Sequence, residues 1–533
     1  MMTGMKPPAG VNLLEALSDN IRVDRDACIG CGVCVERCPM DNLRLKSAPC
    51  TAACPLGVNA QGYVRLIALG EEKAAWDHLS SALPFPGILG RICSRPCESA
   101  CAHNGHDSPP LAIRALKRYL ADMFSEGEEA PLPEPATGKR VAIIGSGPAG
   151  LMAAHDLRVR GHEVLVLEAE RAPGGMLRHA IPAFRLPLGV LEKETGLLNT
   201  IGVRFECGKR VDDMARARLL NEFDAVLVAT GGGASRRLGI PGEDLSGVRH
   251  ALEYLREARE GTGPVTGERT VVLGGGNAAL DAAQTALRLG AREVSVVCLE
   301  ARCEMPAFGW ALDEALAEGV RLMESWGAVR FVGANGKVSG VSLRRCTALF
   351  DESGSFSPRL DACESMTLEA DTVIIAAGQY KESPAAGGGI DPVTLRVDNL
   401  NLFVAGDAAG GPASVVHAMA SGRRAAESIH RLLCGEPLGL GRTATGCVDD
   451  GPVGPHGAIK KDARRPGVRR CEGKGDFGET EAAFDTDSAR AEASRCMSCG
   501  APFGRYRTCW FCLPCEIECP RKAIDVEIPY LLR

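Results

Sequence analysis

Fifteen of the 23 cysteines of this chain stand in dense groups near its two ends. Nine lie between Cys28 and Cys101, six lie between Cys496 and Cys519, and the other eight are scattered through the middle. The chain starts MMTGMKPPAGVNLLEALSDN, without the basic stretch and apolar run of a signal peptide, so we expect a cytoplasmic protein. Thiols stay reduced in the cytosol, where dense cysteine groups indicate metal sites rather than disulfides.

Two of these groups have the same spacing. They are Cys28-x2-Cys31-x2-Cys34-x3-Cys38-Pro39 and Cys509-x2-Cys512-x2-Cys515-x3-Cys519-Pro520. In bacterial ferredoxins such a run places three thiolates on one 4Fe–4S cluster, while the cysteine before proline reaches elsewhere. Zinc ribbons use pairs of CxxC instead. We therefore predict ferredoxin-like iron–sulfur segments at both ends of the chain.

The remaining clustered cysteines are Cys50, Cys54, Cys93, Cys97 and Cys101 in an N-terminal region, and Cys496 and Cys499 ahead of the last run. The N-terminal region has apolar residues at helical spacing, which predicts a small helical domain with thiolates meeting across helix ends. At four cysteines per cluster, fifteen make three clusters with three cysteines left over. A fourth cluster would need a non-cysteine ligand, and the sequence leaves the grouping open.

The middle of the chain carries two dinucleotide-binding patterns. In the first, the strand and helix of VAIIGSGPAGLMAAHDL flank a glycine loop, and the next strand ends at Glu168. The glycines allow a pyrophosphate to approach the helix N-terminus, and the acid would bind the adenosine ribose. The pattern recurs in RTVVLGGGNAALDAAQTAL, with a following strand that ends at Glu300. Two dinucleotides are expected, or one dinucleotide and a vestigial copy of the fold.

A later segment, NLFVAGDAAGGPASVVHAMASGRRAA, predicts a strand that ends at Asp407 and a helix that begins near Ser414. The acid could bond the pyrophosphate or ribityl hydroxyls of a flavin. The helix N-terminus could stabilise negative charge on a reduced isoalloxazine. A capped surface turn is the alternative. Strands in 224–233 and 371–379 fit the crossings between two such domains.

In combination, these motifs resemble a known family. PxCxxxCP, GRIC…CESAC, GGMLRHAIPAFRLP, CEMPA and AAGQ accompany the two glycine loops. This set is similar to the glutamate synthase small subunit, the flavin half of dihydropyrimidine dehydrogenase and the NADPH-side subunit of bifurcating transhydrogenases, over about residues 46–435. The resemblance implies an α/β fold with two Rossmann-like domains in a glutathione-reductase-like arrangement. The first would bind FAD and the second NAD(P)H, and electrons would leave through clusters in the helical domain.

Site residues follow from the motifs and the resemblance together. For FAD they are Gly145, Gly147, Pro148, Ala149, Gly150, Glu168, Gly175, Met176, Leu177, Gly406, Asp407, Ser414 and Val415. For the nicotinamide cofactor they are Gly274, Gly275, Gly276, Asn277, Ala278, Glu300, Arg302 and Gly378. All fifteen clustered cysteines are candidate ligands, which gives three or four 4Fe–4S clusters.

The chain departs from the family pattern after the second glycine loop. NADPH-using relatives have Tyr-Arg-Arg where this chain has Cys298, Leu299 and Glu300. A carboxylate there would repel a 2′-phosphate and accept hydrogen bonds from a free 2′-hydroxyl. The resemblance thus predicts NAD(H) as the cofactor, despite Arg302 nearby.

A second departure concerns the clusters. Relatives have a CxxC shortly before the position of Cys50, and this chain lacks it. We hypothesise that Cys496 and Cys499 fold back and complete a cluster with Cys50 and Cys101. Cys54, Cys93 and Cys97 would form another cluster, but Lys117 stands where some relatives supply a Glu or Gln ligand, and an ammonium cannot ligate iron.

The expected organisation has seven segments. They are a ferredoxin-like segment (1–45), a helical iron–sulfur domain (46–137), the first part of the FAD domain (138–265), the NAD(H) domain (266–374), the second part of the FAD domain (375–435), a linker (436–490) and a second ferredoxin-like segment (491–533). A formal charge of −6 gives no reason to expect nucleic acid, and no apolar run approaches the roughly 18 residues of a membrane span.

The expected function is an electron-transfer subunit. It would exchange a hydride with NAD(H) at FAD and pass single electrons through the clusters, because flavins couple two-electron to one-electron chemistry. The partner would be ferredoxin or a larger complex, such as a 2-oxoacid, aldehyde or aromatic-acyl oxidoreductase. The alternatives are the small subunit of a glutamate synthase and a non-enzymatic cluster relay.

Overall fold

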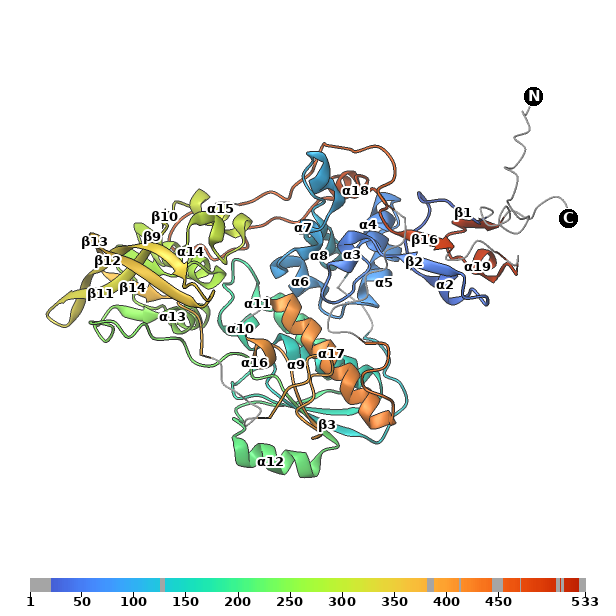
Figure 1. Cartoon of the computed structure of the whole chain (residues 1–533), viewed down its shortest axis with the longest axis horizontal. Helices are drawn as coiled ribbons and strands as arrows, with labels where there is room; N and C mark the ends of the chain where they lie inside the picture. The colour runs from blue at the N-terminus through green and yellow to red at the C-terminus, as the bar shows by residue number, and fades with distance from the viewer. Residues whose placement is uncertain are drawn as a thin grey trace. The chain divides into compact units, whose positions relative to one another are not determined.

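The computed structural model describes residues 21–124, 130–380, 388–411, 414–442, 454–469, 471–504, 509 and 512–526. The chain divides into two units, which are described separately (Figure 1). Unit 1 consists of Met1–Glu129, Gly441–Pro466 and Ala483–Arg533, and unit 2 consists of Ala130–Leu440 and Gly467–Ala482. Within the described residues, no helix combines the length and the apolar character needed to span a membrane.

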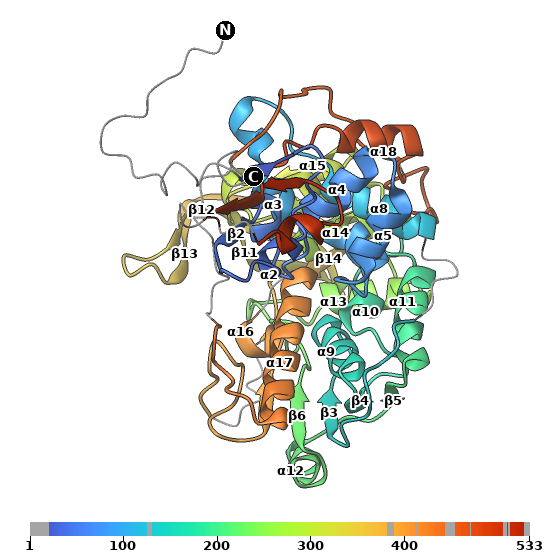
Figure 2. The same ribbon diagram turned by 90° about the vertical axis from the view of Figure 1, so that its right-hand side faces the viewer.

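The first parallel sheet of unit 2 has the strand order β15-β6-β3-β4-β5. Its strands are β3 (Arg140–Ile144), β4 (Glu163–Leu167), β5 (Arg204–Glu206), β6 (Ala225–Val228) and β15 (Leu402–Val404). The central strands are continuous apolar runs because both faces of a parallel sheet are covered. Helix α9 (Pro148–Val159) connects β3 to β4, and α17 (Val415–Cys434) packs along α9 (Figure 2). Helices α11 (Leu188–Thr200) and α12 (Asp213–Glu222) belong to the same half.

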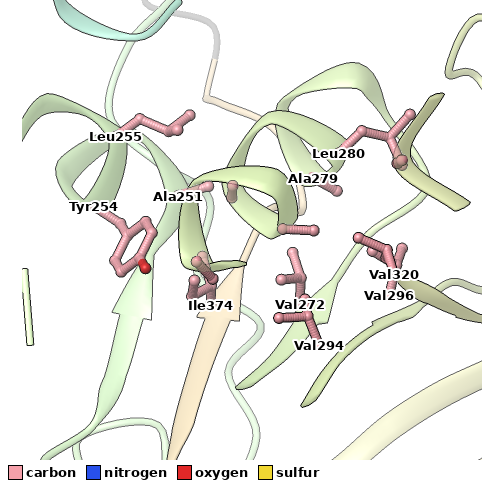
Figure 3. Packing of buried hydrophobic residues seen from close by; sticks show 14 of the residues in the cluster. Ala251, Tyr254, Leu255, Val272, Ala279, Leu280, Val294, Val296, Val320 and Ile374 are labelled. Atoms are coloured by element: carbon pink, nitrogen blue, oxygen red, sulfur yellow. The ribbon is translucent and has the colours of Figure 1, made fainter. Parts of the chain in front are cut away.

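A second parallel sheet of unit 2 has the order β10-β9-β8-β14-β7. Its strands are β7 (Val248–His250), β8 (Arg269–Leu273), β9 (Glu293–Val297), β10 (Arg321–Met323) and β14 (Thr372–Ile375). Helices α13 (Ala251–Arg259), α14 (Asn277–Leu289) and α15 (Gly309–Ala317) cover one face, where Val272 and Ile374 meet Ala279 and Tyr254 (Figure 3).

The other face of the second sheet is covered by strands instead of helices. An antiparallel sheet of β11 (Trp326–Ala334), β12 (Lys337–Phe350) and β13 (Phe356–Glu369) lies there. Side chains alternate along a strand, so Val271 and Leu273 of β8 pack against Phe331 and Val341 of this sheet while Val272 packs against the helices.

The pairing of the short strand β7 places the crossing between the two halves earlier than expected. Val373 of β14 pairs with Val248 of β7, so residues 248–259, including α13, belong to the second sheet and its helices. The sequence suggested a boundary at residue 265. A three-residue strand with half-buried side chains carries almost no periodic signal, so the sequence gives no indication of β7.

In unit 1, a helical domain packs around fully buried apolar side chains, among them Ile67, Trp76, Leu79 and Leu116. Its helices are α3 (Pro49–Ala52), α4 (Ala60–Ala68), α5 (Glu72–Ser80), α6 (Pro86–Ile92), α7 (Pro96–Ser99), η2 (Ala102–His106), α8 (Ile113–Phe124) and α18 (Thr486–Ala493). The sequence placed the start of α18 in the linker 436–490. The helix begins there because Asp485 accepts a hydrogen bond from the Ser488 amide at 2.7 Å and caps its first turn.

The two ferredoxin-like runs are interleaved rather than separate. Strand β1 (Ile21–Val23) pairs antiparallel with β17 (Ile524–Val526), and β2 (Leu43–Lys46) pairs antiparallel with β16 (Ala501–Gly504). The short helices α2 (Val33–Glu36) and α19 (Pro514–Ile517) follow the cysteine loops. The two ends of the chain therefore build one structure within unit 1.

Part of the expected linker belongs to unit 2. Residues 467–469 and 471–482 lie against it. The Thr480 amide donates to the Phe184 carbonyl at 3.0 Å, and the Gly475 amide donates to the Arg288 carbonyl at 2.7 Å. Linker residues 443–453 and 470 lie outside the described part of the chain.

We predict that Gly422→Ala destabilises unit 2 by about 1–3 kcal/mol, the usual effect of overpacking. A Cβ at Gly422 of α17 would lie 2.1 Å from the Ala149 carbonyl oxygen of α9, so the two helices would have to separate. Chemical denaturation of the two proteins measures the difference.

Gly196→Ala is the matched control, because Gly196 is also helical and a Cβ there meets nothing within 4 Å. That variant should be neutral or gain up to about 1 kcal/mol from helix propensity. Equal destabilisation by both substitutions would contradict the close packing of α9 and α17.

Candidate functional site: two glycine loops and four cysteine groups

The glycine loop between β3 and α9 is shaped by contacts that exclude a side chain. Gly145 has φ +101°, and a Cβ there would lie 2.5 Å from the Ala229 carbonyl oxygen. A Cβ at Gly150 would lie 2.0 Å from the Gly145 carbonyl oxygen. A Cβ at Gly147 meets nothing within 4 Å, so this side of the loop is open. The loop therefore packs tightly against the sheet and leaves room for a pyrophosphate at the start of α9, where Pro148 is the first helical residue.

Glu168 follows β4 and lies over this loop. Its Oε2 accepts a hydrogen bond from the Ser146 amide at 2.8 Å, and its Oε1 accepts one from the Glu170 amide at 2.9 Å. Its side chain is 6% exposed. The carboxylate is thus held in a fixed position beside the expected site of the adenosine ribose.

Two further segments named by the sequence converge on the first loop. A Cβ at Gly175 would lie 2.8 Å from the Cα of Gly147, and a Cβ at Gly406 would lie 3.0 Å from the Cβ of Ala149. The segments lead into α10 (Met176–His179) and α16 (Asp407–Gly410). They bring Met176 and Asp407 to the same end of the sheet as the loop.

Three other predicted flavin residues have distinct environments. Ser414 precedes α17, and its Oγ lies 2.8 Å from Nδ1 of His417 instead of bonding a backbone amide of the first turn. Val415 is the first residue of the helix. Leu177, in contrast, is fully buried in α10. Its side chain therefore serves packing, and only its backbone could face a ligand.

The second glycine loop repeats the design of the first. Gly274 has φ +142° and a Cβ there would lie 2.5 Å from the Ala376 carbonyl oxygen, whereas a Cβ at Gly276 meets nothing within 4 Å. A Cβ at Gly275 would lie 2.7 Å from Oε2 of Glu300, so this carboxylate lies directly over the loop. Asn277 is the first residue of α14, and its Oδ1 accepts a hydrogen bond from the Phe308 amide at 3.1 Å.

The surroundings of Glu300 are acidic. Burial, followed by the charges of Glu300 and Glu324, raises the pKa of Cys298 to about 12. The one arginine that the sequence named here, Arg302, pairs with Asp313 at 2.8 Å, and its amide donates to Oε2 of Glu324 at 2.6 Å. Gly378 is the last of the residues predicted for the nicotinamide cofactor. Its carbonyl accepts a hydrogen bond from the Arg236 amide, where the chain crosses between the two halves of unit 2.

A cavity in unit 1 is lined by one cysteine from the end of the chain and three from its start. Its thiols belong to Cys28, Cys31, Cys34 and Cys519. Burial raises the pKa of Cys34 to about 12, and the charges of neighbouring sulfurs, including that of Cys519, add to the effect. The final cysteine of the C-terminal run thus completes the group of the N-terminal run.

The reciprocal group is formed by Cys38 with Cys509, Cys512 and Cys515. Burial raises the pKa of Cys515 to about 11, and the charges of Cys38, Cys509 and Cys512 raise it further. Cys34 and Cys515 share one apolar core with Cys38 and Cys509, so the two groups are neighbours. This exchange of the fourth cysteine is the arrangement of two-cluster ferredoxins.

A third group brings the C-terminal CxxC to the helical domain. Cys50, Cys101, Cys496 and Cys499 line one cavity. Burial raises the pKa of Cys50, and the charges of Cys496, Cys101 and Cys499 add to it. The placement is the one that the fold-back hypothesis requires.

Buried hydrogen bonds hold the returning segment in place. Nε2 of Gln61 donates to the Gly500 carbonyl at 2.7 Å, and the Gly500 amide donates to Oε1 of Gln61 at 2.7 Å. Glu492 and Arg495, both fully buried, form a 2.7 Å ion pair, and Glu492 also accepts the Ala112 amide at 2.9 Å. None of these three residues was predicted from the sequence. Only Glu492 and Arg495 had a signal, as charged residues beside the CxxC.

The last three clustered cysteines, Cys54, Cys93 and Cys97, form a fourth group. Burial raises the pKa of Cys97 well above its usual range, the charge of Lys117 lowers it, and those of Cys93 and Cys54 raise it. No fourth cysteine joins them among the described residues, so the group does not match a cluster with four thiolates.

The spacing of these groups is unlike that of a single-ion site. Among the described residues, no three or more His, Cys, Asp or Glu side chains converge closely enough to hold one metal ion. Zinc needs all four sulfurs at about 2.3 Å, whereas the thiols of the Cys28 group and of the Cys50 group each surround a cavity. Buried thiols with raised pKa values need positive charge to ionise, and bound iron would supply it. Three of the groups fit a 4Fe–4S cluster in donor type and number.

Comparison with known families agrees with this geometry. The family model for pyridine nucleotide-disulphide oxidoreductases matches residues 139–422. The model for dihydropyrimidine dehydrogenase domain II, with a 4Fe-4S cluster, matches residues 36–129, and that for the 4Fe-4S binding domain matches residues 21–44.

Three relatives span most of the chain. It is 32% identical to the beta subunit of NADP(+)-dependent formate dehydrogenase of Moorella thermoacetica, over 93% of this chain and 76% of the relative. It is 32% identical to subunit PreT of NAD-dependent dihydropyrimidine dehydrogenase of Salmonella typhimurium, over 72% of this chain and 91% of the relative. It is also 32% identical to the small chain of the NADPH glutamate synthase of Mycobacterium tuberculosis, over 78% of this chain and 89% of the relative.

The chain belongs to this family of FAD- and NAD(P)-binding iron–sulfur oxidoreductases. Membership confirms the predicted family, FAD and NAD(P) as cofactors, the presence of 4Fe–4S clusters and the oxidoreductase activity. The number of clusters and the individual ligands stay predictions.

A solved structure supports the fold of unit 2. The match to a mutant of FprA from Mycobacterium tuberculosis covers 57% of this chain and 85% of the FprA chain, with a TM-score of 0.50 and 21% identity. The predicted α/β class with two Rossmann-like sheets is confirmed.

We predict that Cys519→Ser removes the same cluster as Cys28→Ser, because both thiols line one cavity. The double variant Cys28→Ser/Cys519→Ser should therefore lose no more iron than either single variant. Cys28→Ser/Cys515→Ser should lose about twice as much, because Cys515 belongs to the other group. Iron analysis and EPR of the reduced protein measure the loss of iron and of cluster signals in each double variant.

Cys434→Ser is the control, since Cys434 is an exposed thiol at the end of α17. It should leave the iron content unchanged. Additive losses for Cys28→Ser/Cys519→Ser would show that each run completes its own cluster.

Proposed function

We propose that this chain is the NAD(H)-side electron-transfer subunit of an oxidoreductase complex, exchanging a hydride with NAD(H) at FAD and single electrons with a partner. The observation that carries the proposal is the pair of glycine loops, each with a glutamate carboxylate lying over it, in a chain that also gathers fifteen cysteines into four groups. A relay without nucleotide chemistry would not need either carboxylate in that position.

Bound FAD would supply the step between two-electron and one-electron chemistry. The chain's own residues bind and orient. Gly147 and Gly276 leave their loops open for pyrophosphates at the starts of α9 and α14, and Glu168 and Glu300 face the riboses. Hydride transfer between stacked rings needs no protein acid or base, so we assign none.

The preference for NAD(H) rests on Glu300. Its carboxylate lies against Gly275, where the adenosine ribose of a bound dinucleotide is expected. A 2′-phosphate there would meet the charges of Glu300 and Glu324, while the Arg302 guanidinium is occupied by Asp313. A free 2′-hydroxyl would instead donate a hydrogen bond to Glu300. Relatives named for either cofactor occur, because the formate dehydrogenase beta subunit is named for NADP(+) and subunit PreT for NAD.

The partner belongs to the proposal as well. The chain is similar to a beta subunit of a formate dehydrogenase, a subunit of a dihydropyrimidine dehydrogenase and the small chain of a glutamate synthase. Each of these names describes one part of a larger enzyme. We infer that the substrate of the complex, such as a 2-oxoacid, aldehyde or aromatic acyl compound, is converted on another chain, or that ferredoxin is the acceptor.

Anaerobic stopped-flow mixing tests the function and the cofactor together. NADH should bleach the flavin and then the clusters, and NADPH should do so far more slowly. Glu300→Gln should lower kcat/KM for NADH by about 10–100-fold, the effect of losing a hydrogen bond to a charged group. Glu300→Gln should also reduce the difference in kcat/KM between NADH and NADPH, because the carboxylate that repels the 2′-phosphate of NADPH has been removed.

Glu293→Gln is the control, because Glu293 is an exposed acid at the opposite end of β9 that pairs with Arg321. It should leave both rates unchanged. Equal reduction of the unaltered protein by NADPH would contradict the role of Glu300. No bleaching by either nucleotide, with flavin and iron present, would favour a cluster relay.

A further inference from the structure

Two crossings of the chain connect the half of unit 2 that has the first glycine loop with the half that has the second. The crossings pair with each other, since Ser235 forms an antiparallel bridge with Gln379. The Gly233 amide donates to the Tyr380 carbonyl at 2.8 Å, and the Tyr380 amide donates to the Ala234 carbonyl at 2.9 Å. A two-stranded ribbon is marginally stable by itself, and domains rotate about such connections. The orientation of the two halves therefore depends on contacts elsewhere.

A loop of the first half makes such contacts with α14 of the second half. The loop is 182–187, between α10 and α11. Nη1 of Arg185 lies 2.7 Å and 2.9 Å from the two carboxylate oxygens of Asp281. The guanidinium of Arg288 lies over the Phe184 ring, with Cζ 3.9 Å from the ring centroid. Asp281 and Arg288 are about two helical turns apart, so the loop lies along α14.

The contact between Phe184 and Arg288 is buried and fixed on both sides. Phe184 is 1% exposed and Arg288 is 1% exposed. The Arg288 guanidinium pairs with both carboxylate oxygens of Glu318 at 2.7 Å, which holds its plane in one orientation. A cation over an aromatic ring is attracted most strongly when both are out of water. The ring of the loop therefore has one defined place on α14.

A segment from the C-terminal part of the chain bonds to both partners of this contact. We call residues 471–482 the strap. The Gly475 amide donates to the Arg288 carbonyl at 2.7 Å, and the Thr480 amide donates to the Phe184 carbonyl at 3.0 Å. Arg288 is in the last turn of α14, where carbonyls have no donor within the helix. One segment thus joins a helix of the second half to a loop of the first.

The strap has a fixed shape of its own. The Arg469 guanidinium, just before the strap, pairs with both carboxylate oxygens of Asp476 at 2.7 Å. Asp476 also accepts the Glu472 amide at 2.8 Å, and the Arg469 amide donates to the Thr480 carbonyl at 2.7 Å. A two-bond pair between a guanidinium and a carboxylate is strong and directional. It closes the strap into a turn that presents the Gly475 and Thr480 amides to unit 2.

We propose that the strap is a clamp that fixes the two halves of unit 2 in the orientation for hydride transfer, by holding loop 182–187 on α14. The inference rests on the proposed function in one respect, that a nicotinamide bound by the second half meets a flavin bound by the first. Arg469 and Asp476 are then positioning residues, which act through the strap.

The clamped elements lead directly to the two nucleotide sites. Helix α14 begins at the second glycine loop, and the segment that leads to loop 182–187 contacts the first, where a Cβ at Gly175 would lie 2.8 Å from the Cα of Gly147. A displacement of about 1 Å between reacting groups can lower a rate about 100-fold. The binding of each dinucleotide is a property of one half, whereas hydride transfer needs both. The strap should therefore act on the rate of transfer and leave nucleotide binding unchanged.

Arg469→Gln tests the clamp without altering loop 182–187, α14 or either glycine loop. It removes the ion pair with Asp476, so the strap should open more often. Hydrogen–deuterium exchange of the full-length protein, measured without added nucleotide, reports this directly. The amides of the strap and of loop 182–187 should exchange at least about tenfold faster, because exchange follows local opening.

Anaerobic stopped-flow mixing with NADH measures the effect on transfer. In Arg469→Gln, the rate constant of flavin reduction at saturating NADH should fall by about tenfold, and the NADH concentration for half the maximal rate should change by less than about twofold. Arg469→Lys should restore most of the rate, since an ammonium can also pair with Asp476. Thr480→Pro removes the amide that bonds to Phe184, so it should give the same kinetic result if Arg469→Gln does not fold.

Arg204→Gln is the matched control, because Arg204 is an exposed arginine of unit 2 that pairs at the surface with Glu163, on the sheet of the first half. It should change neither the exchange nor the rate constant. Unchanged exchange of loop 182–187 in both strap variants would overturn the inference, and so would an unchanged rate constant. A rise in the half-saturating NADH concentration without a fall in the rate constant would also overturn it. If NADH does not reduce the unaltered protein, the proposed function itself is wrong, and the two failures are thereby distinguished.

Discussion

The chemistry of unit 1 depends on the return of the C-terminal segment onto the N-terminal domain. Three of the four cysteine groups contain thiols from both ends of the chain, so none of those three is complete until β16 pairs with β2 and β17 with β1. The return is fixed by buried polar groups. Removing one partner of a buried ion pair such as Glu492–Arg495 costs about 3–5 kcal/mol, because the other charge stays buried. Loss of this pair would therefore disturb three groups at once.

Nucleotide binding by unit 2 depends on a different arrangement, which is present in both halves. In each half a helix begins at an open glycine loop, and a glutamate from the end of the second strand lies over that loop. The helix N-terminus attracts both the carboxylate and an incoming pyrophosphate, so the two must share it. Glu168 is fixed by hydrogen bonds to the Ser146 and Glu170 amides, which leaves the loop free for phosphate.

Much of this arrangement was predictable because glycine loops and cysteine runs have strict local spacing. The sequence predicted both Rossmann-like folds, the two glutamates and the meeting of Cys496 and Cys499 with Cys50. The exchange between the two ferredoxin-like runs was harder to predict, because runs with the same spacing are compatible with two separate folds or with one shared fold. Strand β7, which precedes the suggested boundary at residue 265, was not predictable because it spans only three residues and its place in the second sheet is decided by pairing with β14. Gln61 was missed because a lone helical glutamine has no sequence signal.

The cations of unit 1 are unevenly distributed among the cysteine groups. Burial raises the pKa of Cys496, and the Ser498 amide and the Arg65 charge lower it. Arg25 lies between two groups, since the charges of both Cys499 and Cys28 act on its pKa, which burial lowers overall. Lys117 adds a third cation at Cys97. Cys515, in contrast, is surrounded by other sulfurs, which raise its pKa together with burial. Arg521 gives the ferredoxin-like end a cation of its own, since it lines the cavity of Cys519 and the charge of Cys519 raises its pKa. Because clusters with less negative surroundings are easier to reduce, these cations would make clusters held beside Cys97, Cys499 and Cys519 easier to reduce than one held beside Cys515.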